Sequence, residues 1–132
     1  MANTITLSVT LPATPQALYR AWLSSADHTA FTGSPAQVSG RIGASFTAWD
    51  GYISGKNVRL VENRRIVQSW RTTEFPAGAP DSNLEILFDK VEAGTRITII
   101  HSEIPHGQIS EYRKGWKDFY FTPMKEYFVH KK

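Results

Sequence analysis

The sequence contains no cysteine among its 132 residues, and this absence removes several chemistries at once. Disulfides, thiolate zinc sites, iron–sulfur clusters and cysteine nucleophiles are all excluded. No stretch reaches the roughly 18–20 apolar residues of a membrane-spanning helix. Residues Met1 to Thr4 carry neither the basic nor the apolar part of a signal peptide, so we expect a cytoplasmic protein with no membrane partner.

Catalytic and cofactor motifs are also missing. The sequence has no G-x-S-x-G nucleophile motif, no phosphate-binding loop and no dinucleotide-binding G-x-G-x-x-G. Its four histidines, His28, His101, His106 and His130, are not paired at the spacing of metal ligands. We therefore predict a protein that is not an enzyme and that holds neither a metal nor another cofactor.

The charge balance is only slightly basic, while aromatic residues are plentiful. Fifteen Lys and Arg residues against twelve Asp and Glu give a net charge of +3, which is too small to predict a nucleic-acid partner. The chain has seven Phe, four Trp and five Tyr residues. Aromatic side chains bring a large apolar area with little flexibility, and they build both cores and ligand pockets.

The N-terminal part reads as one strand followed by two short helices. Apolar and polar residues alternate strictly from Thr4 to Leu11, which is typical of a half-buried strand. Thr14 and Pro15 form a helix N-cap and first-turn proline, and that helix should run to about Ser24. A second helix is expected over Ala26 to Phe31, ending at Gly33.

The signal between Pro35 and Ile104 is that of strands joined by short turns. Asp50-Gly51 favours a type I′ hairpin turn. Because the connections are short, the sheet should be antiparallel. The expected strands cover Tyr52 to Glu62, Arg65 to Thr73, the alternating Leu84, Ile86 and Phe88, and finally Ile97, Ile99 and His101.

A long helix is expected at the C-terminus, from a cap at Ser110 to about Val129. Gly115 should let this helix approach the sheet closely, and Pro123 should kink or interrupt it near Phe119, whose carbonyl loses its donor. Residues at helical spacing should face the sheet. These are Tyr112, Trp116, Phe119, Tyr120 and Met124.

Together these elements predict a single α+β domain over residues 1–132, in which one curved antiparallel sheet wraps around the C-terminal helix. The two short helices should close one end. A wrapped sheet of this size often leaves its interior incompletely filled, so we expect a cavity between sheet and helix, lined by aromatic side chains. The residues expected to bind a ligand there are Gln68, Trp70, Ile86, Phe88, Ile97, Ile99, His101, Tyr112, Trp116 and Tyr120.

Three polar side chains are candidates for placing fixed polar groups in this cavity. His101 continues the inward phase of its strand, Glu103 shares that phase, and Gln68 shares the phase of Trp70. A cluster of the three could supply a general base or a ligand contact. The alternative, which we favour, is a strand-end histidine that is hydrogen-bonded to a neighbour.

Several segments along nearly the whole chain resemble the C-terminal domain of the activator of the heat-shock protein 90 ATPase, within the START-like superfamily. The first segment and the last helix are the most specific. The segments are Ala30 to Ala36, Ile53 to Gly55, Leu60 to Glu62, Ile66-Val67, Trp70-Arg71, Gly94 to Ile99, Gly115 to Phe121 and Pro123 to Phe128.

The resemblance implies the helix-grip fold of the birch pollen allergen and, as the superfamily's general property, binding of an apolar small molecule. It also implies a possible stress-response partner, the heat-shock protein 90 chaperone. The eukaryotic co-chaperones carry a separate N-terminal domain, which we expect this chain to lack.

Three functions remain open. The favoured one is a non-catalytic module that binds an apolar or aromatic molecule. The second is a co-chaperone, for which a basic surface with Lys114, Lys117 and Lys125 could matter because these residues lie off the buried helical face. The third is a cyclase- or hydrolase-like enzyme that uses His101 or Glu103 as acid or base.

Overall fold

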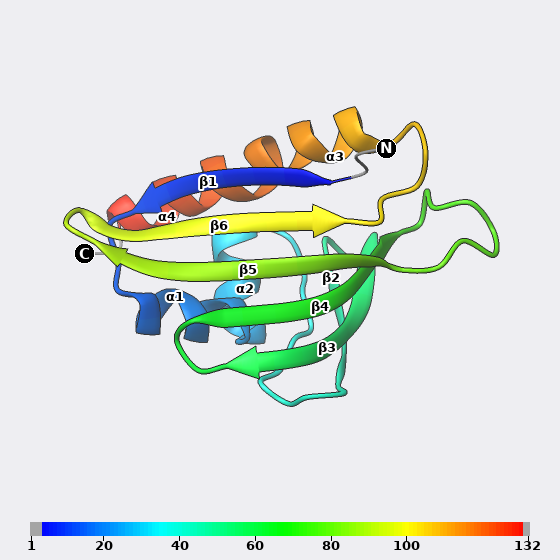
Figure 1. The fold of residues 1–132 in the computed structure, drawn as a ribbon. Coiled ribbons are helices and arrows are strands. Elements are labelled where there is room, and N and C mark those ends of the chain that lie inside the picture. Colours follow the sequence, from blue (N-terminus) through cyan, green and yellow to red (C-terminus); the bar gives the residue numbers. More distant parts are fainter. Residues whose placement is uncertain (1–3, 131–132) are drawn as a thin grey trace.

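The computed structural model describes residues 4–130 and contains one six-stranded antiparallel sheet (Figure 1). Its strand order is β1-β6-β5-β4-β3-β2. The first and last strands in sequence therefore lie side by side, with Ile5 opposite His101. The strands are β1 (Ile5–Leu11), β2 (Ser45–Ala48), β3 (Ile53–Val61), β4 (Arg65–Thr72), β5 (Ser82–Val91) and β6 (Gly94–Ser102).

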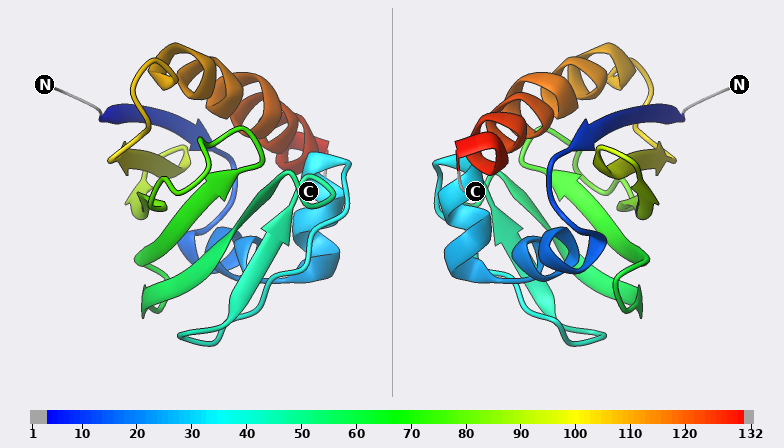
Figure 2. Two further views of the ribbon diagram at one scale, coloured as in Figure 1. Left: turned by 90° about the vertical axis from the view of Figure 1, so that its right-hand side faces the viewer. Right: turned by 90° about the vertical axis from the view of Figure 1, so that its left-hand side faces the viewer.

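Helical segments lie in the three regions where the sequence predicts them. Helices α1 (Pro15–Trp22) and α2 (Ser25–Thr32) connect β1 to the rest of the sheet. The C-terminal helix consists of α3 (Ile109–Gly115), the π-helical segment η1 (Trp116–Phe121) and α4 (Thr122–His130). Figure 2 shows the sheet curling around this helix, so the predicted α+β helix-grip fold is confirmed. No helix within residues 4–130 is long and apolar enough to cross a membrane.

Local signals set the ends of the short helices and the first hairpin. The Thr14 side chain accepts a hydrogen bond from the Ala17 N–H at 3.1 Å, and Gly33 ends α2 with φ of 82°. Asp50 and Gly51 have φ of 57° and 90°, the two positive angles that a type I′ turn requires. Trp49 also has a positive φ, 52°, and this leaves its side chain beside the C-terminal helix rather than in β2.

The C-terminal helix departs from the prediction at its start and in its middle. It begins at Ile109 after Gln108, so Ser110 is not its cap. Pro123 lacks the N–H that would reach the Phe119 carbonyl, and the turn preceding it is π-helical. There the Thr122 N–H donates to the carbonyl of Lys117, five residues earlier. The predicted interruption by Pro123 thus takes the form of a wider turn.

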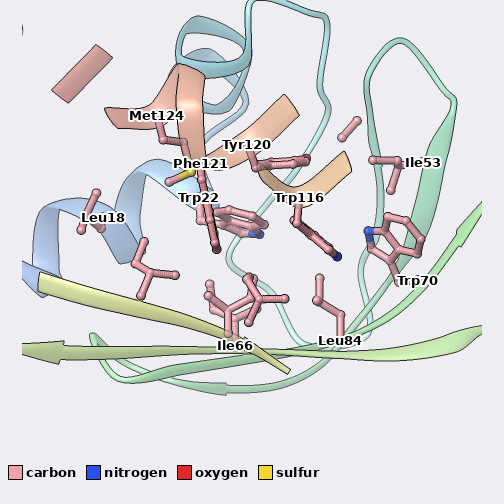
Figure 3. Close-up of a cluster of buried hydrophobic side chains, with 14 of the residues drawn as sticks. Leu18, Trp22, Ile53, Ile66, Trp70, Leu84, Trp116, Tyr120, Phe121 and Met124 are labelled. Atoms are coloured by element: carbon pink, nitrogen blue, oxygen red, sulfur yellow. The ribbon is translucent and has the colours of Figure 1, made fainter. Parts of the chain in front are cut away.

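The wider turn also changes which residues face the sheet. Trp116, Tyr120 and Phe121 are buried, whereas Phe119 has 54% of its surface exposed. The expectation that Phe119 packs against the sheet was therefore wrong, because a π-helical turn contains more residues than the α-helical spacing assumed. Figure 3 shows Trp116 pointing from the helix toward the sheet residue Leu84.

Candidate functional site

A pocket of about 330 Å³ lies between the β2–β3 turn, the end of β4 and the first half of the C-terminal helix. Its inner part is formed by buried side chains, and its outer part by exposed Glu111 and Phe119 and half-buried Trp49 and Tyr52. Most of the lining is aromatic. The lining residues are Trp49, Tyr52, Ile53, Trp70, Glu111, Tyr112, Gly115, Trp116, Phe119 and Tyr120.

The aromatic walls are held by contacts with one another. The ring of Trp70 lies 5.3 Å from that of Tyr112 and 5.7 Å from that of Trp116, centroid to centroid. Trp116 lies 4.9 Å from Tyr120. At the solvent side, Trp49 meets Phe119 edge-on at 5.3 Å. Figure 3 shows Trp70 and Ile53 at one end of this aromatic cluster, facing Trp116 and Tyr120.

Gly115 leaves room in the pocket instead of allowing close helix packing. A Cβ atom at this position would meet only the Phe119 ring, at an ordinary 3.7 Å. The expectation that Gly115 lets the helix approach the sheet was therefore wrong. Glycine inside a helix costs roughly 0.5–1 kcal/mol relative to alanine. Here the missing side chain keeps part of the pocket wall open.

His101 is completely buried and bonded through both ring nitrogens. The Trp116 Nε1–H donates to His101 Nδ1 at 3.1 Å, and Ser82 Oγ lies 2.8 Å from Nε2. The Ser82 hydroxyl donates to the Trp70 carbonyl, so His101 Nε2–H must be the donor to Ser82. The ring is therefore neutral and protonated at Nε2. Burial lowers the pKa of His101 to about 3.

A second buried histidine holds the other end of η1. His28 Nδ1 lies 2.9 Å from the Trp22 carbonyl and must donate to it, so Nε2 accepts from the Tyr120 hydroxyl at 2.9 Å. Burial lowers the pKa of His28 to about 4, an effect that the bond to Trp22 opposes. Burial also raises the pKa of Tyr120, and the neighbouring Trp49 opposes this. Two neutral histidines thus position Trp116 and Tyr120.

The predicted polar cluster does not form. Gln68 is buried and donates to Asn57 Oδ1 at 2.8 Å, while His101 is used by Ser82 and Trp116. Glu103 is exposed and has a φ of 61°. It follows the end of β6, where the backbone leaves the two-residue alternation on which the prediction relied.

Four of the predicted ligand-binding residues line the pocket, namely Trp70, Tyr112, Trp116 and Tyr120. The other six are buried elsewhere in the core and do not line it. They are Gln68, Ile86, Phe88, Ile97, Ile99 and His101.

Six lining residues were not predicted, and two local signals pointed to some of them. Trp49 and Tyr52 flank the Asp50-Gly51 turn, so the sequence places two aromatic residues together at this turn. A glycine in the middle of a predicted helix was the second signal. The six residues are Trp49, Tyr52, Ile53, Glu111, Gly115 and Phe119.

Polar groups at the outer part of the pocket are connected to the start of α3. The Tyr112 hydroxyl donates to Gln108 Oε1 at 2.7 Å and accepts from Thr72 Oγ1 at 2.6 Å. Burial raises the pKa of Tyr112 to about 12. Beside it, the Glu74 carboxyl raises the pKa of Glu111 above its ordinary value. Within residues 4–130, no group of His, Asp or Glu side chains could hold a metal ion.

Residues 12–129 match the sequence family described as Activator of Hsp90 ATPase homolog 1-like protein, which confirms the resemblance drawn from the motifs. The chain is 31% identical over 124 residues to the human activator of 90 kDa heat shock protein ATPase homolog 1. That alignment covers 94% of this chain and 36% of the relative. An uncharacterized protein of Schizosaccharomyces pombe is 29% identical, with 97% and 38% covered. The chain thus spans little more than a third of the length of these relatives.

Solved structures share the fold. A crystal structure of an HSP90 activator from Plasmodium falciparum has a TM-score of 0.87 at 19% identity, with 96% of each chain covered. The solution structure of an Aha1 dimer from Colwellia psychrerythraea has a TM-score of 0.80 at 15% identity, with 98% of each chain covered. At these identities the likeness establishes the fold alone.

Proposed function

Because the chain belongs to the family of Activator of Hsp90 ATPase homolog 1-like proteins, and because it has a START-like fold with an aromatic pocket, we propose that it is a non-catalytic module that binds an apolar or aromatic small molecule. The observation that carries this proposal is the pocket of about 330 Å³ between the β2–β3 turn and the C-terminal helix. A volume of this size is typical of small-molecule sites, which are concave and mostly apolar. We place the protein in the cytoplasm.

The pocket is rigid on its inner side, and rigidity favours binding. Trp116 and Tyr120 are each fixed by a hydrogen bond to a buried histidine, so they lose little freedom when a ligand arrives. Gly115 has no side chain to occupy the pocket, although glycine makes the helix less stable than alanine would. Both features support a ligand site over a cavity left by imperfect packing.

The polar side chains give little support to catalysis. Both nitrogens of His101 are bonded within the core, and Glu103 lies outside the pocket. A general base must reach the proton that it removes. This supports a binding role over the cyclase- or hydrolase-like alternative.

Titration with a panel of apolar and aromatic compounds tests the proposal. We expect saturable changes in tryptophan fluorescence and in the indole N–H resonances of Trp49, Trp70 and Trp116. In Gly115→Leu the added side chain fills the pocket and should abolish the response, whereas Gly115→Ala adds one methyl group and should retain most of it. The absence of saturable binding by any compound, or equal binding by Gly115→Leu, would contradict the proposal.

A co-chaperone role is a second candidate, supported by relatives that are named activators of 90 kDa heat shock protein ATPase. Lys117 and Lys125 are exposed on the C-terminal helix, as is Lys114, which pairs with Asp118. The test is ATPase turnover of a heat-shock protein 90 chaperone with and without this protein. If this role holds, Lys117→Glu with Lys125→Glu should weaken any stimulation, while Lys90→Glu on β5 should not. An unchanged rate with no detectable complex would remove this candidate.

A further inference from the structure

Glu111 is the one charged side chain among the described residues that line the pocket. It comes from the first turn of α3 and stands at the outer part of the pocket. The rest of the lining consists of aromatic rings, Ile53 and Gly115. Neither lysine nor arginine nor histidine is among these residues, so the charge of the pocket has one sign.

The aromatic rings add to this negative character. The face of an aromatic ring is the negative part of its quadrupole and attracts cations within about 6 Å. Trp49, Tyr52, Trp70, Trp116 and Tyr120 offer such rings from the β2–β3 turn, β4 and the C-terminal helix. Rings from three elements and one carboxylate together resemble the cages that hold quaternary ammonium groups.

We propose that the pocket selects an organic cation, an ammonium group on an apolar or aromatic body, with Glu111 as its counter-ion. This inference rests on the proposed function and specifies the class of ligand.

The surroundings of Glu111 favour a cation further. The Glu74 carboxyl is the main cause that raises the pKa of Glu111, followed by burial, and the Tyr52 hydroxyl opposes this rise. Glu74 acts first through a hydrogen bond with Glu111 and only then through the repulsion of its charge. A positive charge placed near these two carboxyl groups favours their ionised forms.

An anion would find little compensation for its lost hydration. Tyr112 donates its O–H to Gln108, Tyr120 to His28, and Trp116 donates its N–H to His101. These three donors are already used within the protein, and the Trp49 Nε1–H, which has no hydrogen-bond partner, is buried and carries no net charge. The lining residues provide no cation to replace water around an anion.

An isosteric pair of probes tests the inference on the full chain. The (4-hydroxyphenyl)trimethylammonium ion and 4-tert-butylphenol have the same shape and differ by a positive nitrogen in place of carbon. We expect the cation to bind about tenfold more tightly, measured by tryptophan fluorescence and indole resonances. Glu111→Gln should reduce this preference several-fold. Glu126→Gln, which removes a carboxylate at an exposed position of α4, should leave the preference unchanged.

The outcomes separate the inference from the proposed function. Equal or tighter binding of the neutral phenol would overturn the cation preference and leave an apolar pocket. A cation preference that falls equally in Glu111→Gln and Glu126→Gln would also overturn it, because the effect would then come from the overall charge. If neither probe binds and the wider panel of compounds also fails, the proposed function itself is contradicted.

Discussion

The Trp116 indole N–H donates to Nδ1 of His101 over 3.1 Å in the interior of the protein. An indole N–H can only donate, so this contact requires an unprotonated Nδ1. A proton added to His101 would place two N–H groups against each other. The bond therefore connects the protonation of a buried histidine to the position of a pocket wall.

The protein should become less stable as the pH is lowered, because the fold holds His28 and His101 in their neutral forms. Their pKa values are lowered to about 4 and about 3, whereas the unfolded chain has an ordinary value near 6.5. Between these values the unfolded state binds more protons, so the free energy of unfolding decreases as the pH falls from about 6.5 toward 4. A tenfold change in proton affinity corresponds to about 1.4 kcal/mol, so the lowered pKa of His28 gives up to about 3 kcal/mol.

Urea denaturation at a series of pH values measures this effect, and histidine replacements isolate it. His28→Gln and His101→Gln keep an amide that can donate and accept, but remove the titrating ring. Each should flatten the dependence of unfolding free energy on pH, even where absolute stability is lower. His106→Gln, at an exposed position, is the control for loss of a histidine. An undiminished slope in both buried variants would contradict the prediction.

The hydroxyl of Tyr120 should contribute to stability through His28. Tyr120→Phe removes the donor to Nε2 and leaves that nitrogen buried without a partner, which typically costs about 1–3 kcal/mol. The measurement is the urea midpoint at neutral pH. Phe119→Leu, which changes an exposed ring on the same helix, should stay within about 0.5 kcal/mol of the parent. Equal stability of Tyr120→Phe and the parent would show that the bond contributes nothing.

Much of the fold could be predicted from sequence features that act over only a few residues. Thr14-Pro15 began a helix, Asp50-Gly51 made a type I′ turn, and alternation from Thr4 to Leu11 gave a strand, because cap and turn chemistry needs no distant partner. Ser110 was wrongly predicted as the cap: it lies inside the first turn of α3, and Gln108 before it bonds to Tyr112 and to the Glu74 carbonyl. That contact brings together segments far apart in the sequence.

The only pocket-lining residues that could be predicted were those that the helical or strand periodicity places on an inward face. Trp70 and Trp116 were predicted because strand and helix periodicity placed them on the inward faces of their elements. These two faces meet at the pocket. Glu111 and Trp49 could not be found in this way. Glu111 lies off the buried face of α3, and Trp49 is turned toward the helix by a positive φ that periodicity does not encode.

Two glycines should respond to alanine in opposite directions. Gly115→Ala meets no close atom and should raise the free energy of unfolding by about 0.5–1 kcal/mol, since helical alanine is favoured over glycine. A Cβ on Gly55 of β3 would lie 1.8 Å from the Ser69 carbonyl oxygen, so Gly55→Ala must move the backbone and should cost more than about 2 kcal/mol. Chemical denaturation measures both changes. Destabilisation by Gly115→Ala would mean that the helix needs this glycine for packing.

The affinity for an organic cation should depend on pH through Glu111. Its pKa lies above the ordinary 4.5, chiefly because of a hydrogen bond with Glu74 and then because of burial, while a hydrogen bond with Tyr52 opposes this rise. Tyr112 is a further titratable neighbour of Glu111 on this side of the pocket. The ionised carboxylate is the form that attracts a cation, so affinity should be lower at pH 5 than at pH 7.5. The neutral 4-tert-butylphenol should bind equally at both values, and Glu111→Gln should remove most of the difference for the cation. A cation affinity that is constant or higher at pH 5 would mean that Glu111 does not serve as its counter-ion.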